Sequence, residues 1–224
     1  MIVVHHLNNS RSQRIVWLLE ELGMSYRLER YQRDAKTNLA PPELRSVHPL
    51  GKSPVIEDGD LRLSESGAIV EYLVERHGAG RLAPPRGTPE HVRYLHWMHF
   101  AEGTLMLHLV ARLYLARAGD AARALLARVE GMIGDELDLV EAELARSAHV
   151  AGAEFSAADV QMLFPLEFAV FANLAGERHG RLRDYVARMQ ARPAYRRAIE
   201  TGGAYLFDSA SAREATPFPM PKKA

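Results

Sequence analysis

The proline-rich segment of residues 79–89 separates two parts of the chain with different hydrophobic patterns. Before it, short β-branched stretches alternate with stretches of helical periodicity. Beyond it, to about Gly202, apolar residues recur at helical spacing. We therefore expect a mixed α/β domain at residues 1–79, a linker at residues 80–89, an all-helical domain at residues 90–207 and a loosely held tail at residues 208–224.

The first part predicts a mixed sheet of about four strands. Residues 2–6 and 26–29 are predicted to be strands on either side of a helix that Gly23 ends. Residues 55–63 carry the pattern of a hairpin, and a second helix follows from Ser66. The strand–helix–strand unit implies a right-handed parallel crossover, to which the hairpin adds antiparallel strands.

The second part predicts an all-α fold. Ser156 and Asp159 form a capping box just before an apolar stretch, which marks the start of one helix. Residues 119–120 and 151–152 contain glycine and separate the first three helices. The expected helices lie near residues 89–118, 121–147, 156–172, 180–191 and 193–202.

Composition narrows the functional classes. Lys plus Arg and Asp plus Glu each total 28, so the chain lacks the basic excess that is typical of nucleic-acid binding. It contains no cysteine, which excludes disulfides, thiolate metal sites and cysteine nucleophiles. The N-terminus does not resemble a signal peptide, and no apolar run approaches the ~20 residues of a membrane span. We expect a cytoplasmic protein with neither nucleic-acid nor membrane partners.

Two short segments have both a structural and a functional interpretation. Residues 51–54, Gly-Lys-Ser-Pro, lead into a strand, and a trans Pro54 that ends a loop is the commoner arrangement. A cis Pro54 would instead turn the main chain of Ser53 outward, where it could pair with an extended peptide. Similarly, Glu65 and Ser66 either cap a helix or bind the ammonium and carboxylate groups of an amino-acid end.

The turn of residues 8–14, between the first strand and the first helix, is open to the same two interpretations. Ser10 or Ser12 could cap the helix. Alternatively, a hydroxyl there could donate a hydrogen bond to an anion held above the helix N-terminus.

In this order and at this spacing, the segments resemble the cytosolic glutathione transferases over about residues 1–205. Residues 10–22 (SRSQRIVWLLEEL) and 48–54 (HPLGKSP) are similar to a bacterial and fungal branch of that family. The capping box of Ser156 matches the one in the family's sixth helix. The resemblance implies a thioredoxin-like N-terminal domain that binds glutathione, followed by an all-helical domain.

The resemblance also implies a role for individual residues. The Ser53 main chain, beside a cis Pro54, would pair with the cysteinyl part of glutathione, while Glu65 and Ser66 would hold its γ-glutamyl end. Lys52, and also Lys36 or His48, would face the glycyl carboxylate. The full implied set is Lys52, Ser53, Pro54, Glu65 and Ser66, with Lys36 and His48 as further candidates.

The group that activates the glutathione thiol would be a hydroxyl in the first turn. Ser10 lies four residues before Arg14, where theta-like and zeta-like members carry their catalytic serine. Asn9 is the second candidate and Ser12 the third. The loop has no tyrosine, unlike that of the alpha, mu and pi classes, and beta-like members carry a cysteine at the position of Asn9.

The helix expected after the linker offers candidates for the acceptor side. His96, His99 and Glu102 recur at spacing three and could in principle hold a metal, although no companion motif supports this. The resemblance instead places this helix beside the active cleft and a dimer interface. The acceptor pocket would then be lined by His99, Glu102, Gly103 and Met106, with exposed helix surface as the alternative.

The expected function is conjugation of the glutathione thiolate to small electrophilic, hydrophobic acceptors, with reduction of organic hydroperoxides as a second expected activity. Glutathione would be a cosubstrate, no metal is implied, and the protein would be a homodimer active in detoxification. The alternatives are an isomerase or dehalogenase on the same scaffold, and a non-catalytic glutathione-binding or interaction module.

Overall fold

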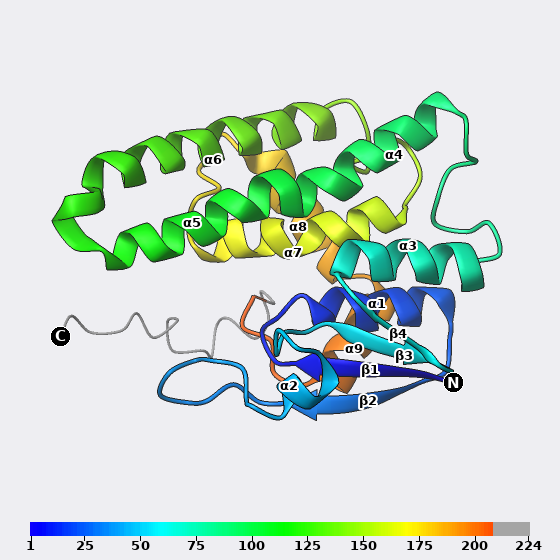
Figure 1. The fold of residues 1–224 in the computed structure, drawn as a ribbon. Coiled ribbons are helices and arrows are strands. Elements are labelled where there is room, and N and C mark those ends of the chain that lie inside the picture. The colour runs from blue at the N-terminus through cyan, green and yellow to red at the C-terminus, as the bar shows by residue number, and fades with distance from the viewer. Residues whose placement is uncertain (208–224) are drawn as a thin grey trace.

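A computed structural model of the chain describes residues 1–207, which fold into a sheet-containing lobe below a helical lobe (Figure 1). Residues 208–224, where a loosely held tail is expected, lie outside the described residues. A mixed four-stranded sheet with helices, followed by helices alone, confirms the predicted fold class.

The sheet has the strand order β2-β1-β3-β4. β1 pairs in parallel with β2, from Ile2 opposite Tyr26 to Leu7 opposite Tyr31. β1 is antiparallel to β3, and β3 is antiparallel to β4. The predicted crossover and hairpin are therefore both present. The strands are β1 (Ile2–Leu7), β2 (Tyr26–Tyr31), β3 (Val55–Asp58) and β4 (Leu61–Ser64).

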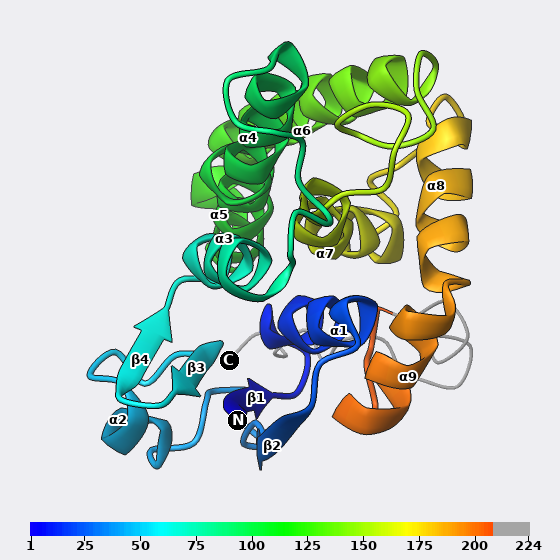
Figure 2. The same cartoon turned by 90° about the vertical axis from the view of Figure 1, so that its right-hand side faces the viewer.

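Two helices of this lobe, α1 (Ser12–Leu22) and α3 (Ser66–His77), lie between the sheet and the helical lobe (Figure 2). Gly23 ends α1 at φ 67°, a left-handed conformation that glycine adopts without steric cost. A single short helix, α2 (Leu44–Val47), forms in the proline-containing stretch before β3. The N-termini of α1 and α3 both lie close to the junction of the lobes.

In the helical lobe, the long helix expected at residues 89–118 is interrupted by a π-helical turn, η1, at Ala101–Leu105. Gly103, with its low helix propensity, lies inside this turn. A 3₁₀ turn, η2 (Gly119–Ala122), precedes the next helix. The α-helices are α4 (Pro89–Phe100), α5 (Met106–Arg117), α6 (Arg123–Leu144), α7 (Ala157–Phe171), α8 (Gly180–Gln190) and α9 (Pro193–Gly202).

α7 forms the centre of the helical lobe, and its residues 157–169 are all buried. The predicted capping box at Ser156 and Asp159 is present. The Asp159 carboxylate also accepts hydrogen bonds from the Tyr185 hydroxyl at 2.7 Å and from the Val150 N–H at 3.1 Å. These bonds join the start of α7 to α8, so the capping box also serves the packing of the lobe.

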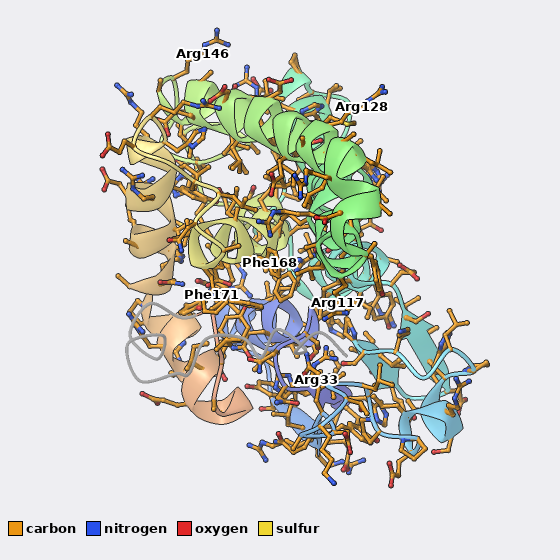
Figure 3. All side chains as sticks on the ribbon, turned by 90° about the vertical axis from the view of Figure 1, so that its left-hand side faces the viewer. Arg33, Arg117, Arg128, Arg146, Phe168 and Phe171 are labelled. Atoms are coloured by element: carbon orange, nitrogen blue, oxygen red, sulfur yellow. The ribbon has the colours of Figure 1, made fainter. Side chains whose placement is uncertain are left out.

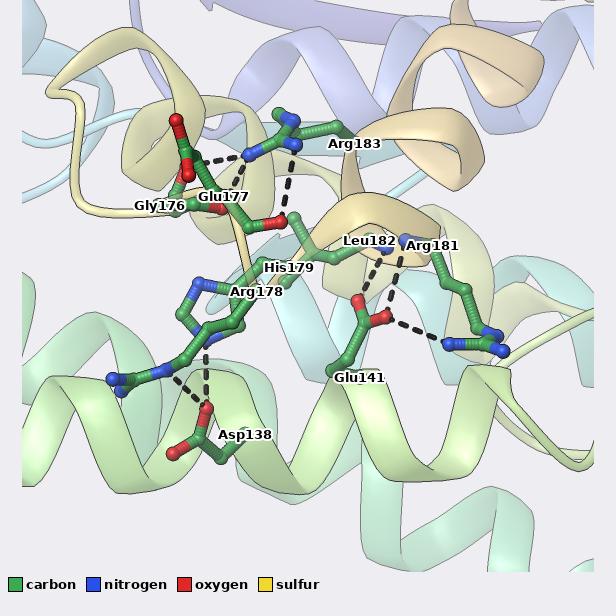
Figure 4. A network of polar contacts seen from close by, with 10 residues as sticks. Asp138, Glu141, Gly176, Glu177, Arg178, His179, Arg181, Leu182 and Arg183 are labelled. Atoms are coloured by element: carbon green, nitrogen blue, oxygen red, sulfur yellow. Dashed lines mark hydrogen bonds and ion pairs between the residues drawn. The ribbon is translucent and has the colours of Figure 1, made fainter.

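Two carboxylates of α6 anchor the start of α8 (Figure 4). Asp138 accepts from Arg178 Nε at 2.7 Å and lies 2.9 Å from His179 Nε2. Glu141 accepts from the main-chain N–H groups of Arg181 and Leu182 at 3.1 and 2.9 Å. Glu141 thus caps the first turn of α8 from another helix, which satisfies N–H groups that have no partner within α8.

α9 packs against α1, although the helical lobe precedes it in the chain (Figure 2). The rings of Trp17 and Tyr195 meet edge to face with centroids 5.4 Å apart. Arg192 Nε and Glu21 Oε1 form an ion pair at 2.6 Å. The chain therefore returns to the first lobe before its end. Within residues 1–207, no helix combines the length and apolar character that crossing a membrane requires.

Candidate functional site

A cavity of about 640 Å³ opens at the junction of the two lobes. From the sheet-containing lobe it is lined by Arg11, by the loop before β3 and by residues 64–68 at the start of α3. From the helical lobe it is lined by residues of α4 and η1 and by Gln161 of α7. Elements that lie far apart in the sequence therefore build its walls.

The Ser53–Pro54 peptide bond is cis. The Ser53 hydroxyl donates to the His5 carbonyl at 2.8 Å and accepts from the Leu7 N–H at 3.2 Å, so its side chain is fixed on β1. Neither the main-chain N–H nor the carbonyl of Ser53 bonds to another described residue. Because Ser53 lines the cavity, this main chain is available to an extended peptide.

One interpretation of the sequence makes Glu65 and Ser66 caps of a helix, but at the start of α3 neither side chain caps the helix. Glu65, not Ser66, occupies the N-cap position. Glu65 is exposed and has φ 69°, which is uncommon for a residue other than glycine. Ser66 is the first helical residue. The free N–H groups at the start of α3 therefore present the positive end of the helix dipole to the cavity.

The Ser66 hydroxyl is held by two side chains. It accepts a hydrogen bond from Arg14 Nη1 at 3.3 Å and from Gln161 Nε2 at 3.5 Å. Gln161 is completely buried, and its Oε1 atom has no partner among the described residues. Sequence reasoning missed Gln161, because a glutamine inside an apolar helix carries no motif. Gln161 also lines the cavity.

An ion-pair cluster spans the junction of the lobes. Glu102 Oε1 accepts from Arg14 Nη1 at 2.8 Å, and Glu102 Oε2 accepts from Arg11 Nε at 2.7 Å. Burial lowers the pKa of Arg14, which Glu102 offsets. The Arg14 guanidinium also lies over the Phe164 ring, 5.1 Å from its centroid. Within this cluster two cations share one carboxylate, while Glu65 at the open end of α3 carries a further negative charge.

The candidate thiol activators occupy the adjacent turn but do not line the cavity; Arg11 does. Ser10 is buried, and its Oγ lies 2.8 Å from Ser12 Oγ. Ser12 Oγ lies in turn 2.9 Å from His6 Nδ1. Asn9 accepts from the Leu206 N–H through its side-chain oxygen at 2.8 Å. All three residues therefore already have a hydrogen-bond partner within the chain.

Of the remaining predicted site residues, some line the cavity and others lie outside it. Lys52 and His48 line the cavity, whereas Lys36 does not. On the helical side, His99, Glu102 and Gly103 line it, whereas Met106 is buried in the core. Of the three residues at spacing three that could have held a metal, Glu102 binds Arg11 and Arg14. His96 packs against Trp97 and Phe100. Among residues 1–207, no group of three or more potential ligands is placed to hold a metal ion.

Comparison with known proteins gives one family. Residues 1–75 match the model of the glutathione S-transferase N-terminal domain. Glutathione S-transferase 3 of Schizosaccharomyces pombe is 33% identical over 242 aligned positions, covering 100% of this chain and 98% of the relative. The chain belongs to the glutathione transferase family. Glutathione S-transferase 1 of Saccharomyces cerevisiae is 30% identical, covering 75% of this chain and 81% of the relative.

The structural comparison agrees with this membership. The crystal structure of a glutathione S-transferase from Actinobacillus pleuropneumoniae is 32% identical, with a TM-score of 0.84. It covers 90% of this chain and 93% of its own. The match extends over both lobes, so the relationship is not confined to the N-terminal domain of the family model. The resemblance proposed from the sequence motifs is confirmed.

Proposed function

We propose that this chain is a glutathione transferase that joins the glutathione sulfur to small electrophilic, hydrophobic acceptors. One observation carries the proposal: the cavity contains both the free main chain of Ser53 and the uncapped start of α3. An extended tripeptide that ends in an amino-acid group can pair with the Ser53 main chain and place its terminal carboxylate at the start of α3. Family membership supports the assignment.

In this proposal, glutathione lies along the sheet-containing wall. Its cysteinyl main chain pairs with Ser53, next to the cis Pro54. Its γ-glutamyl carboxylate accepts from the Ser66 hydroxyl and the first N–H groups of α3, and Glu65 binds the ammonium group. The glycyl carboxylate faces Lys52 and His48, which line the same cavity.

The chemical step begins with loss of the thiol proton to solvent. We assign the stabilising donor to Ser10, whose hydroxyl must turn away from Ser12 to reach the sulfur. The thiolate then forms a bond to the electrophilic carbon, and the leaving group departs with its electron pair. With an organic hydroperoxide, the thiolate attacks the terminal oxygen and releases the alcohol; a second glutathione then displaces water to give the disulfide.

The acceptor enters from the helical side of the cavity. His99 and Gly103 form part of this wall, with Glu102 held in place by its two arginines. Met106 lies behind the wall in the core and contributes to its shape only through packing. We also propose that the protein works in the cytoplasm, where glutathione is kept reduced.

A homodimer belongs to the same proposal. The outer face of α4 carries an exposed Val92 beside a shallow hollow lined by His96, His99 and Phe100. This mixed aromatic and aliphatic face is suited to a second copy of the chain. Light scattering of the purified protein tests this point independently of catalysis.

The central test is direct. The protein should bind immobilised glutathione and be eluted by free glutathione. It should also conjugate 1-chloro-2,4-dinitrobenzene, with cumene hydroperoxide as the second acceptor. Failure to bind would overturn the whole proposal. Binding without turnover of either acceptor would favour a non-catalytic module, or an isomerase or dehalogenase with a narrow substrate range.

A further inference from the structure

Arg33, which follows β2, holds the turn that contains the thiol activators. Its Nε donates to the Asn8 carbonyl at 3.1 Å, and its Nη2 donates to the Asn9 carbonyl at 3.3 Å. Its main-chain N–H donates to the Asn8 side chain at 2.8 Å. Its Nη1 reaches the Asn38 carbonyl at 3.0 Å. One guanidinium thus joins two loops through three carbonyl oxygens.

The charge of Arg33 is not neutralised locally. Within residues 1–207, no carboxylate lies within ion-pair distance of its guanidinium; its partners there are carbonyl dipoles. Burial lowers the pKa of Arg33, and the neighbouring positive charge of Arg11 lowers it further. Arg33 therefore adds to the positive field of Arg11 at this turn.

The carbonyls that Arg33 holds immediately precede Ser10. Asn9 has φ 51°, a conformation that asparagine tolerates better than most residues but that still needs support. With the Asn8 and Asn9 carbonyls held by Arg33, the path of the chain into Ser10, Arg11 and the first N–H groups of α1 is fixed. Figure 3 shows Arg33 within the sheet-containing lobe, below Phe168 and Phe171 at the junction of the lobes.

We propose that Arg33 is a positioning residue for thiol activation, because its bonds to the Asn8 and Asn9 carbonyls fix the turn that presents Ser10 to the glutathione sulfur. Its uncompensated charge also favours the thiolate over the thiol. Arg33 acts through the turn and through the field, without touching the substrate. The inference rests on the proposed function, since it needs a bound thiol.

Other charged groups also surround the expected place of the thiol. The charged and titratable groups that line the cavity are Arg11 at the start of α1, His48 and Lys52 before β3, Glu65 and Glu71 of α3, and His99 and Glu102 of the helical lobe. A substitution at Arg33 keeps every one of these residues in the sequence, so their own charges are the same in each variant. A shift in the ionisation of bound thiol in an Arg33 variant would therefore report on Arg33 itself.

The test titrates the ultraviolet absorbance of the glutathione thiolate bound to each variant. Arg33→Met removes the charge but keeps most of the side-chain length, and should raise the pKa of the bound thiol by about half a unit. At a pH below that pKa, kcat/KM should then fall about threefold through a smaller thiolate fraction. Arg33→Lys keeps the charge but cannot bridge three carbonyls, so it loses the positioning alone and should still raise the pKa, by about half as much as Arg33→Met.

Arg81→Met is the matched control. Arg81 also donates to two main-chain carbonyls, those of Gly78 and Leu22, and has no carboxylate partner among the described residues. It lies at the far end of α1, about 15 Å from the turn by helix length. Arg81→Met should titrate like the wild type.

Two outcomes would overturn the inference. One is an Arg33→Met variant that keeps the wild-type circular dichroism, binds glutathione and titrates like the wild type. The other is an equal shift in Arg81→Met, which would indicate a general charge effect. If Arg33→Met does not fold, an unshifted Arg33→Lys variant with lowered thermal stability would assign Arg33 a structural role alone. Absence of glutathione binding by the wild type would contradict the proposed function instead.

Discussion

Glu102, in the π-helical turn, binds Arg14, in the first helix, with 2.8 Å between Oε1 and Nη1. The two residues are 88 positions apart and belong to different lobes. The Arg14 side chain is almost fully buried, whereas that of Glu102 is about one-third exposed. Glu102 therefore compensates a charge that water does not reach, and the ion pair sits directly behind the Ser66 hydroxyl.

Glu102→Gln should destabilise the fold. The substitution leaves the buried Arg14 guanidinium without its anion, while the amide still accepts one hydrogen bond. Because Glu102 is partly exposed, we expect a loss of about 2 kcal/mol in the free energy of unfolding, less than for a fully buried pair. Urea denaturation at neutral pH measures it.

Glu154→Gln provides the control for that loss. Glu154 is exposed, precedes α7 and has no ion pair with another described residue. Its substitution changes the net charge equally and should alter stability by less than about 0.5 kcal/mol. Equal losses in the two variants would show that the ion pair with Arg14 contributes nothing specific.

Ser10→Ala should raise the pH at which bound glutathione ionises. A hydroxyl that donates to a thiolate stabilises the charged form, so its removal should raise the thiol pKa by about one unit. Spectroscopic titration of the bound thiolate measures this shift. Ser46→Ala, an exposed serine outside the cavity, is the control. An unchanged titration in Ser10→Ala would transfer the role to other donors of the turn.

The sequence predicted the fold well, because most of it depends on local patterns. Hydrophobic periodicity predicted the strands and helices, and glycine and proline predicted where they end, as Gly23 does for α1. The π-helical turn was not predicted, because Gly103 lowers helix propensity without specifying what replaces the α-helix. Nor did any local pattern show that α9 returns to pack on α1.

The lining of the cavity was predictable where it comes from short segments with a recognisable motif. Lys52, Ser53, Glu65 and Ser66 all line the cavity as expected. Their roles toward glutathione remain predictions. The assignment of Glu65 rather than Ser66 to the N-cap position depends on backbone angles that residue type does not determine.

The supporting residues were harder to find. Gln161 donates a hydrogen bond to Ser66, which lies 95 positions earlier in the sequence. Arg33 donates to the carbonyl of Asn8, 25 positions earlier. Such contacts depend on tertiary packing, and no sequence motif around a single glutamine or arginine predicts them.

Asn9 should matter for stability through its contact with the chain end. Its side chain accepts from the Leu206 N–H, and its left-handed φ of 51° disfavours alanine. Asn9→Gly should lose the hydrogen bond, about 1 kcal/mol, and Asn9→Ala about 1 kcal/mol more through backbone strain. Chemical denaturation of both variants measures the two parts separately.

Asn38 is a close match for that comparison. It also has positive φ, 58°, and its carbonyl also accepts from Arg33, but its side chain bonds to no described residue. Asn38→Gly should therefore cost less than Asn9→Gly by about the value of the Leu206 bond, ~1 kcal/mol. Identical losses at the two positions would remove any role for the Leu206 contact.

His6 should make the fold sensitive to mild acid. Burial lowers the pKa of His6 to about 4, against a small opposing effect of its bond to the Gly202 main chain. As the pH falls below 6.5, the unfolded chain takes up the proton first, so stability is lost between pH 6.5 and 4. The linkage predicts a loss of about 2 kcal/mol between pH 7 and pH 5 from this residue.

His6→Asn keeps an acceptor for Ser12 and should therefore lose about 2 kcal/mol less stability than the wild type between pH 7 and pH 5. Urea denaturation at the two pH values measures the difference. His91→Asn, at a half-buried histidine, should follow the wild type. A wild-type loss that His6→Asn reproduces in full would show that other groups carry the acid sensitivity.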